Sequence, residues 1–258
     1  MILTSAQNSK IKLINRLRSK RGREQAARFA IDYERDLRRA LDCGYSVDFV
    51  LHCPEIAELD LPADVEAHRV SIQLMPRISY RENPGGILAV MHSRPKQGLP
   101  ELKQAAINHA LVLVDLRVPG NIGALLRTAD ATGIDAIVLV DTALDLYNPN
   151  IIRSSTGACF LDNVYQLSGD EAAEYLKGGG IQLVCADVDG ATDLFELEFQ
   201  GRSAIVLGAE DRGLDRFWLA QADSRVKIPM AGGLSDSLNV SVSGAILMYE
   251  YYRQRQSS

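Results

Sequence analysis

The chain has 258 residues, 47% hydrophobic and 24% charged, a balance typical of a folded globular protein with one large domain or two modest ones. No apolar run approaches the roughly 20 residues that span a bilayer, and the first residues lack the apolar segment of a signal peptide. The four cysteines show no C-x-x-C pattern and the four histidines no metal-binding spacing. These features favour a cytoplasmic protein with reduced thiols, no metal and no membrane partner.

The net charge of −5 is unevenly distributed along the chain. Residues 1–40 hold eleven Lys or Arg and four acidic residues, so they carry +7 and the remaining 218 residues carry −12. This asymmetry excludes a uniformly basic protein and indicates a basic arm on an acidic body, with phosphate groups as the natural partner. A solvated helix face would give the same charge run, and charge alone leaves both interpretations open.

The first half of the chain alternates short predicted helices and strands. The spacing of Ile11, Ile14 and Leu17 predicts an amphipathic basic helix from Ser9 to about Lys20. The other predicted helices span residues 34–43 and 71–78, and the predicted strands span 28–31, 47–51, 65–70 and 87–92. Residues 1–95 therefore predict a small α/β domain that carries the basic arm.

The stretch SRPKQGLP, residues 93–100, has the composition of a linker, with two prolines, a glycine and one large apolar residue. We place the domain boundary there, with residues 96–105 as linker and residues 106–258 as the second domain. In this second domain near-continuous apolar strands are predicted at 110–114, 136–140, 181–186, 204–207 and 225–228, with helices at 124–132, 150–155, 171–176 and from about Asn239. Such strands alternating with helices predict a parallel sheet covered on both faces.

Two loops follow the last predicted strands. Each is rich in glycine and small polar residues, and the second runs directly into the final helix. A strand–loop–helix arrangement of this kind presents backbone N–H groups to a ligand. Neither strand is followed by G-x-G-x-x-G, and no G-x-x-x-x-G-K-[ST] occurs, so the pocket has a different plan from the common nucleotide sites.

Three motifs in the second half occur in a fixed order. They are PGNIGALLRTA at 119–129, LGAEDRGL at 207–214, and IPM at 228–230 followed by SLNVSVS at 237–243. A fourth match is DLYNP at 145–149 with RSSTGA at 153–158. From about Ala110 onward the chain resembles the SpoU/TrmH family of RNA ribose 2′-O-methyltransferases. The first half resembles the ribosomal-protein-like substrate-binding domain of many members, although Asp32-Tyr33 stands where relatives often have Glu-Gly and Asp211 replaces a frequent glycine.

The resemblance implies an α/β protein with an N-terminal RNA-binding domain and a C-terminal parallel-sheet domain that contains a deep trefoil knot. It implies S-adenosylmethionine (SAM) as methyl donor and no metal. The cofactor-binding residues carried over are Leu207, Gly208, Ile228, Met230, Ser237 and Leu238, which act mostly through backbone groups. It also implies a homodimer, formed by the final helix and the first-motif helix, that completes the active site. Intramolecular packing of the face formed by Val240, Ser243, Gly244, Leu247 and Tyr251 is the alternative for the final helix.

The catalytic residues implied by the motifs are Arg127, Asn121, Glu210, Ser237 and Asn239. In the family this arginine is proposed to act as, or to assist, the base. Because arginine is effectively never deprotonated, we expect Arg127 instead to fix a phosphate and to stabilise developing alkoxide charge. Asn121 is expected to orient Arg127 or the ribose. Glu210 is expected to hold Arg127 or to organise the knot, with a structural salt bridge as the alternative. Asn239 has a helix N-cap as its alternative role. The expected RNA contacts are Lys10, Lys12, Arg16, Arg18 and Arg153.

These features predict a SAM-dependent RNA ribose 2′-O-methyltransferase. The appended domain favours ribosomal RNA over tRNA as substrate. A tRNA methyltransferase and a non-catalytic RNA-binding or ribosome-assembly protein on the same fold are the alternatives. The joint presence of Asn121, Arg127, Glu210 and Asn239 argues against lost catalysis. A dinucleotide-dependent oxidoreductase is disfavoured because Gly120-x-x-Gly123 has the wrong spacing.

Overall fold

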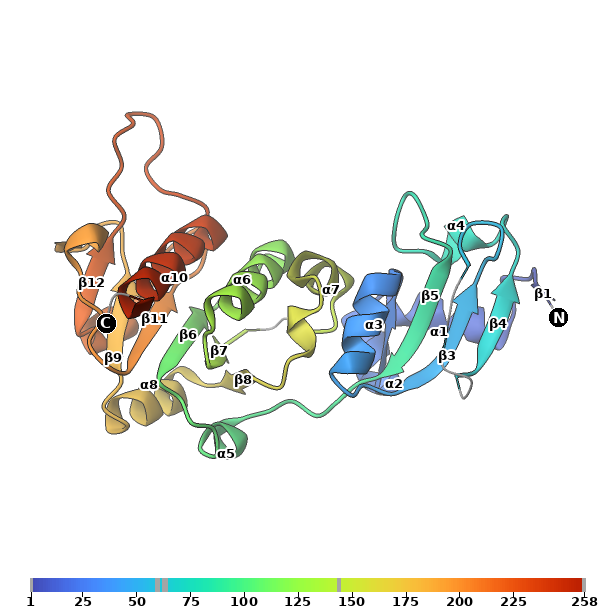
Figure 1. Ribbon diagram of the computed structural model, residues 1–258, viewed down its shortest axis with the longest axis horizontal. Coiled ribbons are helices and arrows are strands. Elements are labelled where there is room, and N and C mark those ends of the chain that lie inside the picture. The colour runs from blue at the N-terminus through green and yellow to red at the C-terminus, as the bar shows by residue number, and fades with distance from the viewer. Residues whose placement is uncertain (1, 59–60, 62–64, 143–144, 257–258) are drawn as a thin grey trace. The chain divides into compact units, whose positions relative to one another are not determined.

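A computed structural model describes residues 2–58, 61, 65–142 and 145–256, and the chain forms two compact units (Figure 1). The first unit contains Met1–Pro95 and Asp145–Asp162, and the second contains Lys96–Leu144 and Asn163–Ser258. Residues 145–162, which are predicted to lie in the second domain, belong to the first unit. The stretch predicted as a linker contains a short helix, α5 (Leu99–Leu102), with Leu102 buried in the core of the second unit.

The first unit is built on a five-stranded sheet with strand order β1-β4-β3-β5-β2. The pairs β1/β4 and β4/β3 are parallel, whereas β3/β5 and β5/β2 are antiparallel. The strands are β1 (Ile2–Leu3), β2 (Arg28–Ile31), β3 (Val47–His52), β4 (Ala67–Val70) and β5 (Ile87–His92). The predicted small α/β unit is confirmed, and β1 is an additional two-residue edge strand.

The helices of the first unit are α1 (Ser9–Leu17), α2 (Lys20–Ala26), α3 (Glu34–Asp42), α4 (Met75–Ile78) and α7 (Pro149–Ser155), followed by the 3-10 turn η1 (Ala158–Phe160). Ile11, Ile14 and Leu17 are buried along one face of α1, as their spacing predicts. The single helix predicted to reach Lys20 is wrong. Helix α1 ends at Leu17, with Arg18 as its C-cap. The Ser19 hydroxyl then accepts a hydrogen bond from the Gly22 amide at 3.1 Å and so caps a second helix, α2.

The segment Asp145–Asp162 completes the core of the first unit. Arg23 and Asp145 form a buried ion pair, with Nη2 and Oδ2 2.7 Å apart. The ring of Tyr147 stacks on Phe29 with centroids 4.3 Å apart, and Phe160 packs on the same ring at 5.8 Å. These buried contacts explain why the segment belongs to this unit although it is distant in sequence.

The second unit contains a seven-stranded sheet with strand order β10-β12-β9-β11-β6-β7-β8, in which every pair is parallel. The strands are β6 (His109–Val114), β7 (Ala136–Val140), β8 (Val164–Leu167), β9 (Gln182–Ala186), β10 (Thr192–Asp193), β11 (Ser203–Leu207) and β12 (Ser224–Lys227). The predicted parallel sheet is confirmed. The two strands that pattern reading missed, β8 and β10, are the short edge strands.

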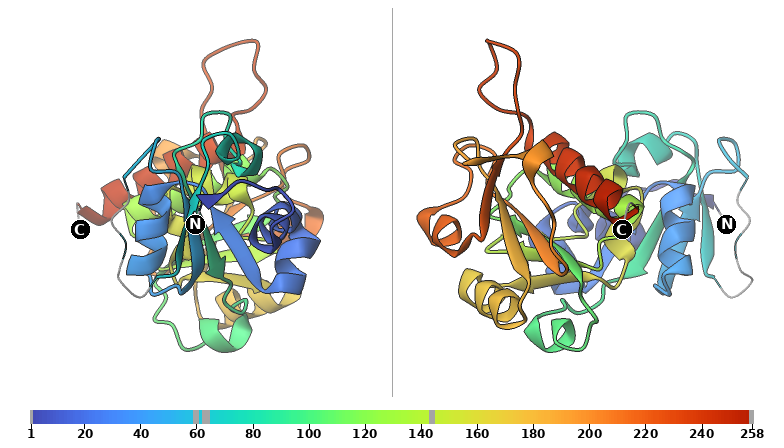
Figure 2. Two further views of the ribbon diagram at one scale, coloured as in Figure 1. Left: turned by 90° about the vertical axis from the view of Figure 1, so that its right-hand side faces the viewer. Right: turned by 60° about the vertical axis from the view of Figure 1, so that its left-hand side comes forward.

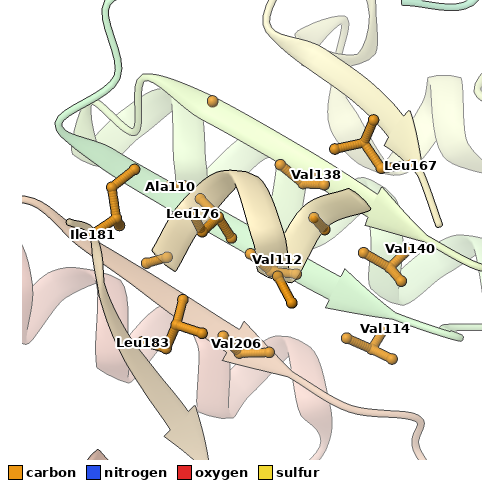
Figure 3. Close-up of a cluster of buried hydrophobic side chains, with 14 of the residues drawn as sticks. Ala110, Val112, Val114, Val138, Val140, Leu167, Leu176, Ile181, Leu183 and Val206 are labelled. Carbon is orange, nitrogen blue, oxygen red and sulfur yellow. The ribbon is translucent and has the colours of Figure 1, made fainter. Parts of the chain in front are cut away.

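Helices cover both faces of this sheet. They are α5, α6 (Pro119–Thr132), α8 (Gly169–Gly178), the 3-10 turn η2 (Leu194–Glu196), α9 (Arg216–Gln221) and α10 (Val240–Gln256). On one face, Leu176 of α8 lies over strand side chains that include Val112 and Val138 (Figure 3). On the other face α10 packs on α6 and β11, and at Gly244 the helix approaches the side chains of Leu125 and Leu207 so closely that a Cβ would collide with them.

The face of α10 that carries Gly244, Leu247 and Tyr251 is therefore packed within the unit. This is the intramolecular alternative of the sequence analysis, and it removes those residues from the expected dimer surface. No helix in the described part of the chain has both the length and the apolar character to cross a membrane. The trefoil knot stays a prediction.

Candidate active site

The carboxyl ends of two neighbouring parallel strands bring together the first two motifs. Strand β6 leads into Asp115 and then into α6, and its neighbour β11 leads into the loop Gly208–Asp215. In parallel sheets ligands bind outside this edge, because the loops that leave adjacent strands meet there. Pro119–Gly123 are predicted as a loop, but they form the first turn of α6, with proline at the start where its missing N–H is harmless.

Glu210 joins the two loops. Its carboxylate accepts hydrogen bonds from the backbone amides of Arg117 at 3.3 Å and Val118 at 3.2 Å, and from Asn121 Nδ2 at 3.0 Å. These donors stand at the entrance of α6, where helix N–H groups lack partners within the helix. Glu210 therefore acts as a remote cap of α6. Among the described residues it forms no hydrogen bond or ion pair with Arg127, so the expected role of holding Arg127 is not seen within one chain.

Asn239 connects the start of α10 to the same network. Its Nδ2 donates to Asn121 Oδ1 at 3.2 Å, and its Oδ1 accepts from the Ser241 amide at 2.9 Å. The second bond is the expected N-cap of α10, and the first adds a link to α6. The amide of Asn121 thus lies between Glu210 and Asn239, so three motifs distant in sequence are hydrogen-bonded in one chain of side chains. Asn121 does not orient Arg127 in this arrangement.

A second pair of contacts reinforces this edge and was missed by sequence reasoning. Asp115, directly after β6, forms ion pairs with Arg117 at 2.9 Å and with Arg212 from the loop after β11. Asp115 has a backbone φ of +51°, a left-handed conformation that aspartate tolerates better than most residues. Two features of the sequence could have indicated these ion pairs: the position of Asp115 directly after a buried strand, and the arginine inside the second motif.

The acidic side chains of the site are ionised at neutral pH. Burial tends to raise the pKa of Glu210, but the hydrogen bonds from Asn121 and from the backbone outweigh it, so the pKa lies below its ordinary value. The pKa of Asp115 is lowered first by its hydrogen bond to Arg117 and also by the charge of Arg212. Both carboxylates therefore serve as fixed acceptors here, not as proton donors.

The fold of the loop after β11 requires a glycine at position 208. A Cβ at this position would collide with the backbone of Gly213 and Leu214, because the loop turns back on itself and Ala209 pairs with Gly213. The expected close backbone approach at Gly208 is present, and the approaching group is the loop's own backbone. Leu207 before it is buried at the end of β11.

The segment between β12 and α10 carries the remaining residues expected to bind a cofactor, and both views of Figure 2 show it extending away from the sheet. Ile228 and Leu238 are half-buried, whereas Met230 and Ser237 are exposed. Within the described part of the chain, the backbone groups of residues 229–238 form no hydrogen bond. Unpaired backbone donors and acceptors beside apolar side chains are the groups that an adenosine needs.

Arg127 lies on α6 but away from this network. It is exposed and forms no hydrogen bond or ion pair with any described residue. Because α6 starts at Pro119, Arg127 stands six residues beyond Asn121, about 9 Å further along the helix and on another side of it. Within a single chain the structure brings Asn121, Glu210 and Asn239 together and leaves Arg127 and Ser237 outside.

The comparisons with known proteins agree with the motifs. The model of the SpoU rRNA Methylase family matches residues 108–249, and that of the MRM3-like substrate binding domain matches residues 8–89. The chain belongs to the SpoU rRNA methylase family. It is 30% identical over 96% of its length to the Bacillus subtilis 23S rRNA (guanosine(2553)-2'-O)-methyltransferase RlmP, of which 97% is covered.

Solved structures of SpoU methyltransferases share the whole fold. A crystal structure of an RNA 2'-O ribose methyltransferase is 33% identical, covers 99% of this chain and 100% of its own, and has a TM-score of 0.84. The SpoU methyltransferase AviRb of Streptomyces viridochromogenes, in complex with the cofactor AdoMet, is 26% identical with a TM-score of 0.84, covering 98% of this chain and 100% of its own. The family resemblance read from the motifs is thus confirmed.

The five expected RNA contacts of this SpoU protein all lie in the first unit. Lys10 pairs with Glu66 at 3.1 Å, and Arg18 donates to the Ser79 carbonyl at 2.9 Å, so both also have structural partners. Lys12 is exposed with no partner among the described residues. Arg16 donates to Gln25, and Arg153 to the Asn150 side chain at 2.9 Å. Arg153 of the fourth motif therefore belongs to the same unit as the basic arm.

No group of three His, Cys, Asp or Glu side chains in the described residues is placed to hold a metal ion.

Proposed function

We propose that this protein transfers the methyl group of SAM to a ribose 2′-hydroxyl of ribosomal RNA. The observation that carries the proposal is the hydrogen-bonded chain Glu210–Asn121–Asn239, which joins the three family motifs at the carboxyl edge of the sheet. A relative with the same fold binds AdoMet, and the Bacillus subtilis relative that matches 96% of this chain is named for 2'-O-methylation of 23S rRNA. The unpaired backbone of residues 229–238, with Ile228 and Leu238 beside it, would hold the cofactor, which supplies an electrophilic methyl group.

Methyl transfer to oxygen is an in-line displacement, so the protein must hold the two reacting atoms in line and reduce the cost of forming an alkoxide. The Glu210–Asn121–Asn239 network fixes the loops that would surround both reactants. Glu210 and Asp115 already accept several hydrogen bonds each, so neither is a free base. We assign to Arg127 the binding of an RNA phosphate and the stabilisation of the developing negative charge on the ribose oxygen.

Arg127 performs this role from the second subunit of a homodimer. It is exposed and unpartnered in the described chain, and it has no contact with Asn121, Glu210 or Asn239 of its own subunit. The outer side of α10 carries exposed apolar residues, Val242, Tyr249 and Tyr252, although its inner face is already packed. A second copy on α6 and this outer side of α10 would bury them and bring Arg127 to the partner's network.

The reaction takes place in the cytoplasm, where free thiols persist. The four cysteines are free, which suits a reducing compartment. Ribosomal RNA is favoured over tRNA because the first unit matches a substrate-binding domain and because relatives are named for 23S rRNA.

The test uses methyl-labelled SAM with unmodified ribosomal RNA or tRNA, followed by alkaline digestion. A 2′-O-methyl group blocks attack of that oxygen on the adjacent phosphodiester, so the label should persist in alkali-resistant dinucleotides from ribosomal RNA. Label in those dinucleotides from tRNA would reassign the substrate. Label in mononucleotides would mean base methylation and would overturn the proposal, as would SAM binding without transfer to either RNA.

A further inference from the structure

We propose that Tyr33, Arg35 and Arg81 of the first unit form a docking point for an unpaired RNA base, here called the Tyr33 cluster. The inference rests on the proposed function, which makes RNA the ligand of this unit. It concerns the residue directly before α3, where an exposed aromatic ring lies beside two arginines. The structure indicates what the tyrosine adds.

The cluster places three planar groups together at the surface. Tyr33 directly precedes α3 and its side chain is 37% exposed. The guanidinium carbon of Arg81 lies 4.5 Å from the centre of the Tyr33 ring, and that of Arg35 lies 5.0 Å from it. Two cations on one exposed ring repel each other, so the surrounding residues must hold them in place.

Two carboxylates, that of the half-buried Asp32 and that of the buried Asp36, hold the two sides of the cluster. Asp32 accepts hydrogen bonds from the Tyr80 amide at 3.1 Å and from the Ser79 hydroxyl at 3.3 Å, and these bonds fix the backbone that carries Arg81. Arg35 pairs with Asp36 at 2.8 Å, and the Asp36 side chain is only 3% exposed. The two guanidinium groups are therefore positioned before any ligand arrives, which lowers the entropy cost of binding.

Two other arginine–aromatic pairs in this unit serve the fold. Arg18 lies over Tyr80 and donates to the Ser79 carbonyl, and Arg94 lies over the buried Tyr45 ring and donates to the Cys43 carbonyl at 2.7 Å. The guanidinium of Arg81 differs, because it forms no hydrogen bond and no ion pair within 4 Å with any described residue. Burial raises the pKa of Asp32 and Asp36, and the charge of Arg81 acts at longer range to lower both pKa values in part. Among the residues that the structure describes, an exposed ring and an arginine without a hydrogen-bond or ion-pair partner coincide only in the Tyr33 cluster.

An exposed ring beside guanidinium planes matches the chemistry of an unpaired nucleotide. Unpaired bases stack on aromatic rings and on guanidinium planes, while the guanidinium N–H groups bind phosphate oxygens. A base inside a duplex has no free face for such stacking. The Tyr33 cluster should therefore add affinity for single-stranded segments and none for double-stranded ones, whereas charge alone would favour both.

The experiment measures binding of the full-length protein to a short unstructured RNA and to the same RNA annealed to its complement. Tyr33→Gly removes the ring, and Tyr33→Phe keeps the ring as the matched control. Arg81→Lys keeps the charge and removes the plane. We expect Tyr33→Gly to weaken single-strand binding about fivefold or more, with duplex binding unchanged and Tyr33→Phe close to wild type. Arg81→Lys should weaken single-strand binding in the same selective way.

A second readout separates stacking from a general loss of structure. A fluorescent base analogue in the single strand should be quenched on binding wild type and Tyr33→Phe, and much less on binding Tyr33→Gly. Equal losses for both RNAs, or unchanged binding by Tyr33→Gly, would overturn the proposal. If no RNA is methylated but the selective loss appears, the Tyr33 cluster stands and the proposed function falls. If methylation proceeds and Tyr33→Gly binds normally, only the cluster falls.

Discussion

The free energy that the buried ion pair between Arg23 and Asp145 contributes to stability can be predicted from the structure. The two side chains are 5% and 8% exposed, and Arg23 Nη2 lies 2.7 Å from Asp145 Oδ2 while Nε lies 3.3 Å from Oδ1. Arg23 also donates to the carbonyls of Leu17 and Arg18 at 2.9 and 3.1 Å. The pair links α2 to the distant segment 145–162, so its loss should release that segment.

The substitution Arg23→Met keeps most of the side-chain volume and leaves the Asp145 carboxylate buried without a partner. Removing one member of a buried pair costs about 3–5 kcal/mol, chiefly because the other charge is left desolvated. The double variant Arg23→Met/Asp145→Leu removes both charges, and an apolar replacement of a whole pair is often neutral. The two carbonyls that lose a donor still cost about 1 kcal/mol each. The double variant should therefore be more stable than the single one by about 2 kcal/mol or more.

Amide hydrogen exchange followed by mass spectrometry measures this cost within the affected unit. A loss of about 4 kcal/mol corresponds to roughly a thousandfold faster exchange through opening of the segment. We expect that acceleration in peptides from residues 145–162 and α2 of Arg23→Met, partial recovery in the double variant, and unchanged exchange in β6 and β11 as internal controls. Exchange of residues 145–162 within about threefold of wild type would refute the docking of this segment in the first unit.

Three further predictions test packing, pH dependence and thiol burial. Gly244→Ala must displace two buried leucines, which costs about 1–3 kcal/mol of stability and exceeds the gain of up to about 1 kcal/mol in helix propensity. In the control variant Gly178→Ala the added methyl group points into open space. The urea midpoint of unfolding should therefore fall for Gly244→Ala and not for Gly178→Ala. Glu210 has a lowered pKa, so its contribution to stability is present at neutral pH and is lost as pH falls through that lowered value. The free energies of unfolding of wild type and Glu210→Gln should therefore differ near neutral pH and converge in acid. A difference in unfolding free energy that stays constant with pH would contradict the assigned hydrogen bonds. Burial raises the pKa of Cys159 and Cys185 to about 12 each, so iodoacetamide should label neither thiol until denaturant is added.

Local patterns were sufficient for most of the second unit. Its strands are buried on both faces, and runs such as Ala136–Val140 are continuously apolar, so their type, position and parallel pairing follow from the sequence. The start of α6 was placed too late because Pro119-Gly120 is typical of a turn, yet proline suits the first position of a helix. The short helices α2 and α9 lack a long apolar period and depend on tertiary packing.

The contacts that decide the domain division were beyond local patterns. Asp145 and Arg23 are separated by 122 residues in sequence, and no hydrophobic periodicity near either residue predicts that they pair. The same limit applies to the site. Asn121, Glu210 and Asn239 were each identified from motifs, but the hydrogen bonds between them depend on the adjacency of β6 and β11. Arg127 was expected beside this network, and the structure shows why a single chain does not place it there.

The role of Arg127 is the claim on which the proposed mechanism depends most directly. The decisive measurement is the single-turnover rate of methyl transfer by Arg127→Ala at saturating RNA, with SAM affinity measured in parallel and Arg127→Lys as the charge-retaining control. We expect the transfer rate to fall about a hundredfold or more, with unchanged SAM affinity and an intermediate rate for lysine, because a preorganised donor to the developing oxyanion is lost. A transfer rate close to wild type under these conditions would contradict the mechanism and the dimeric site that it requires.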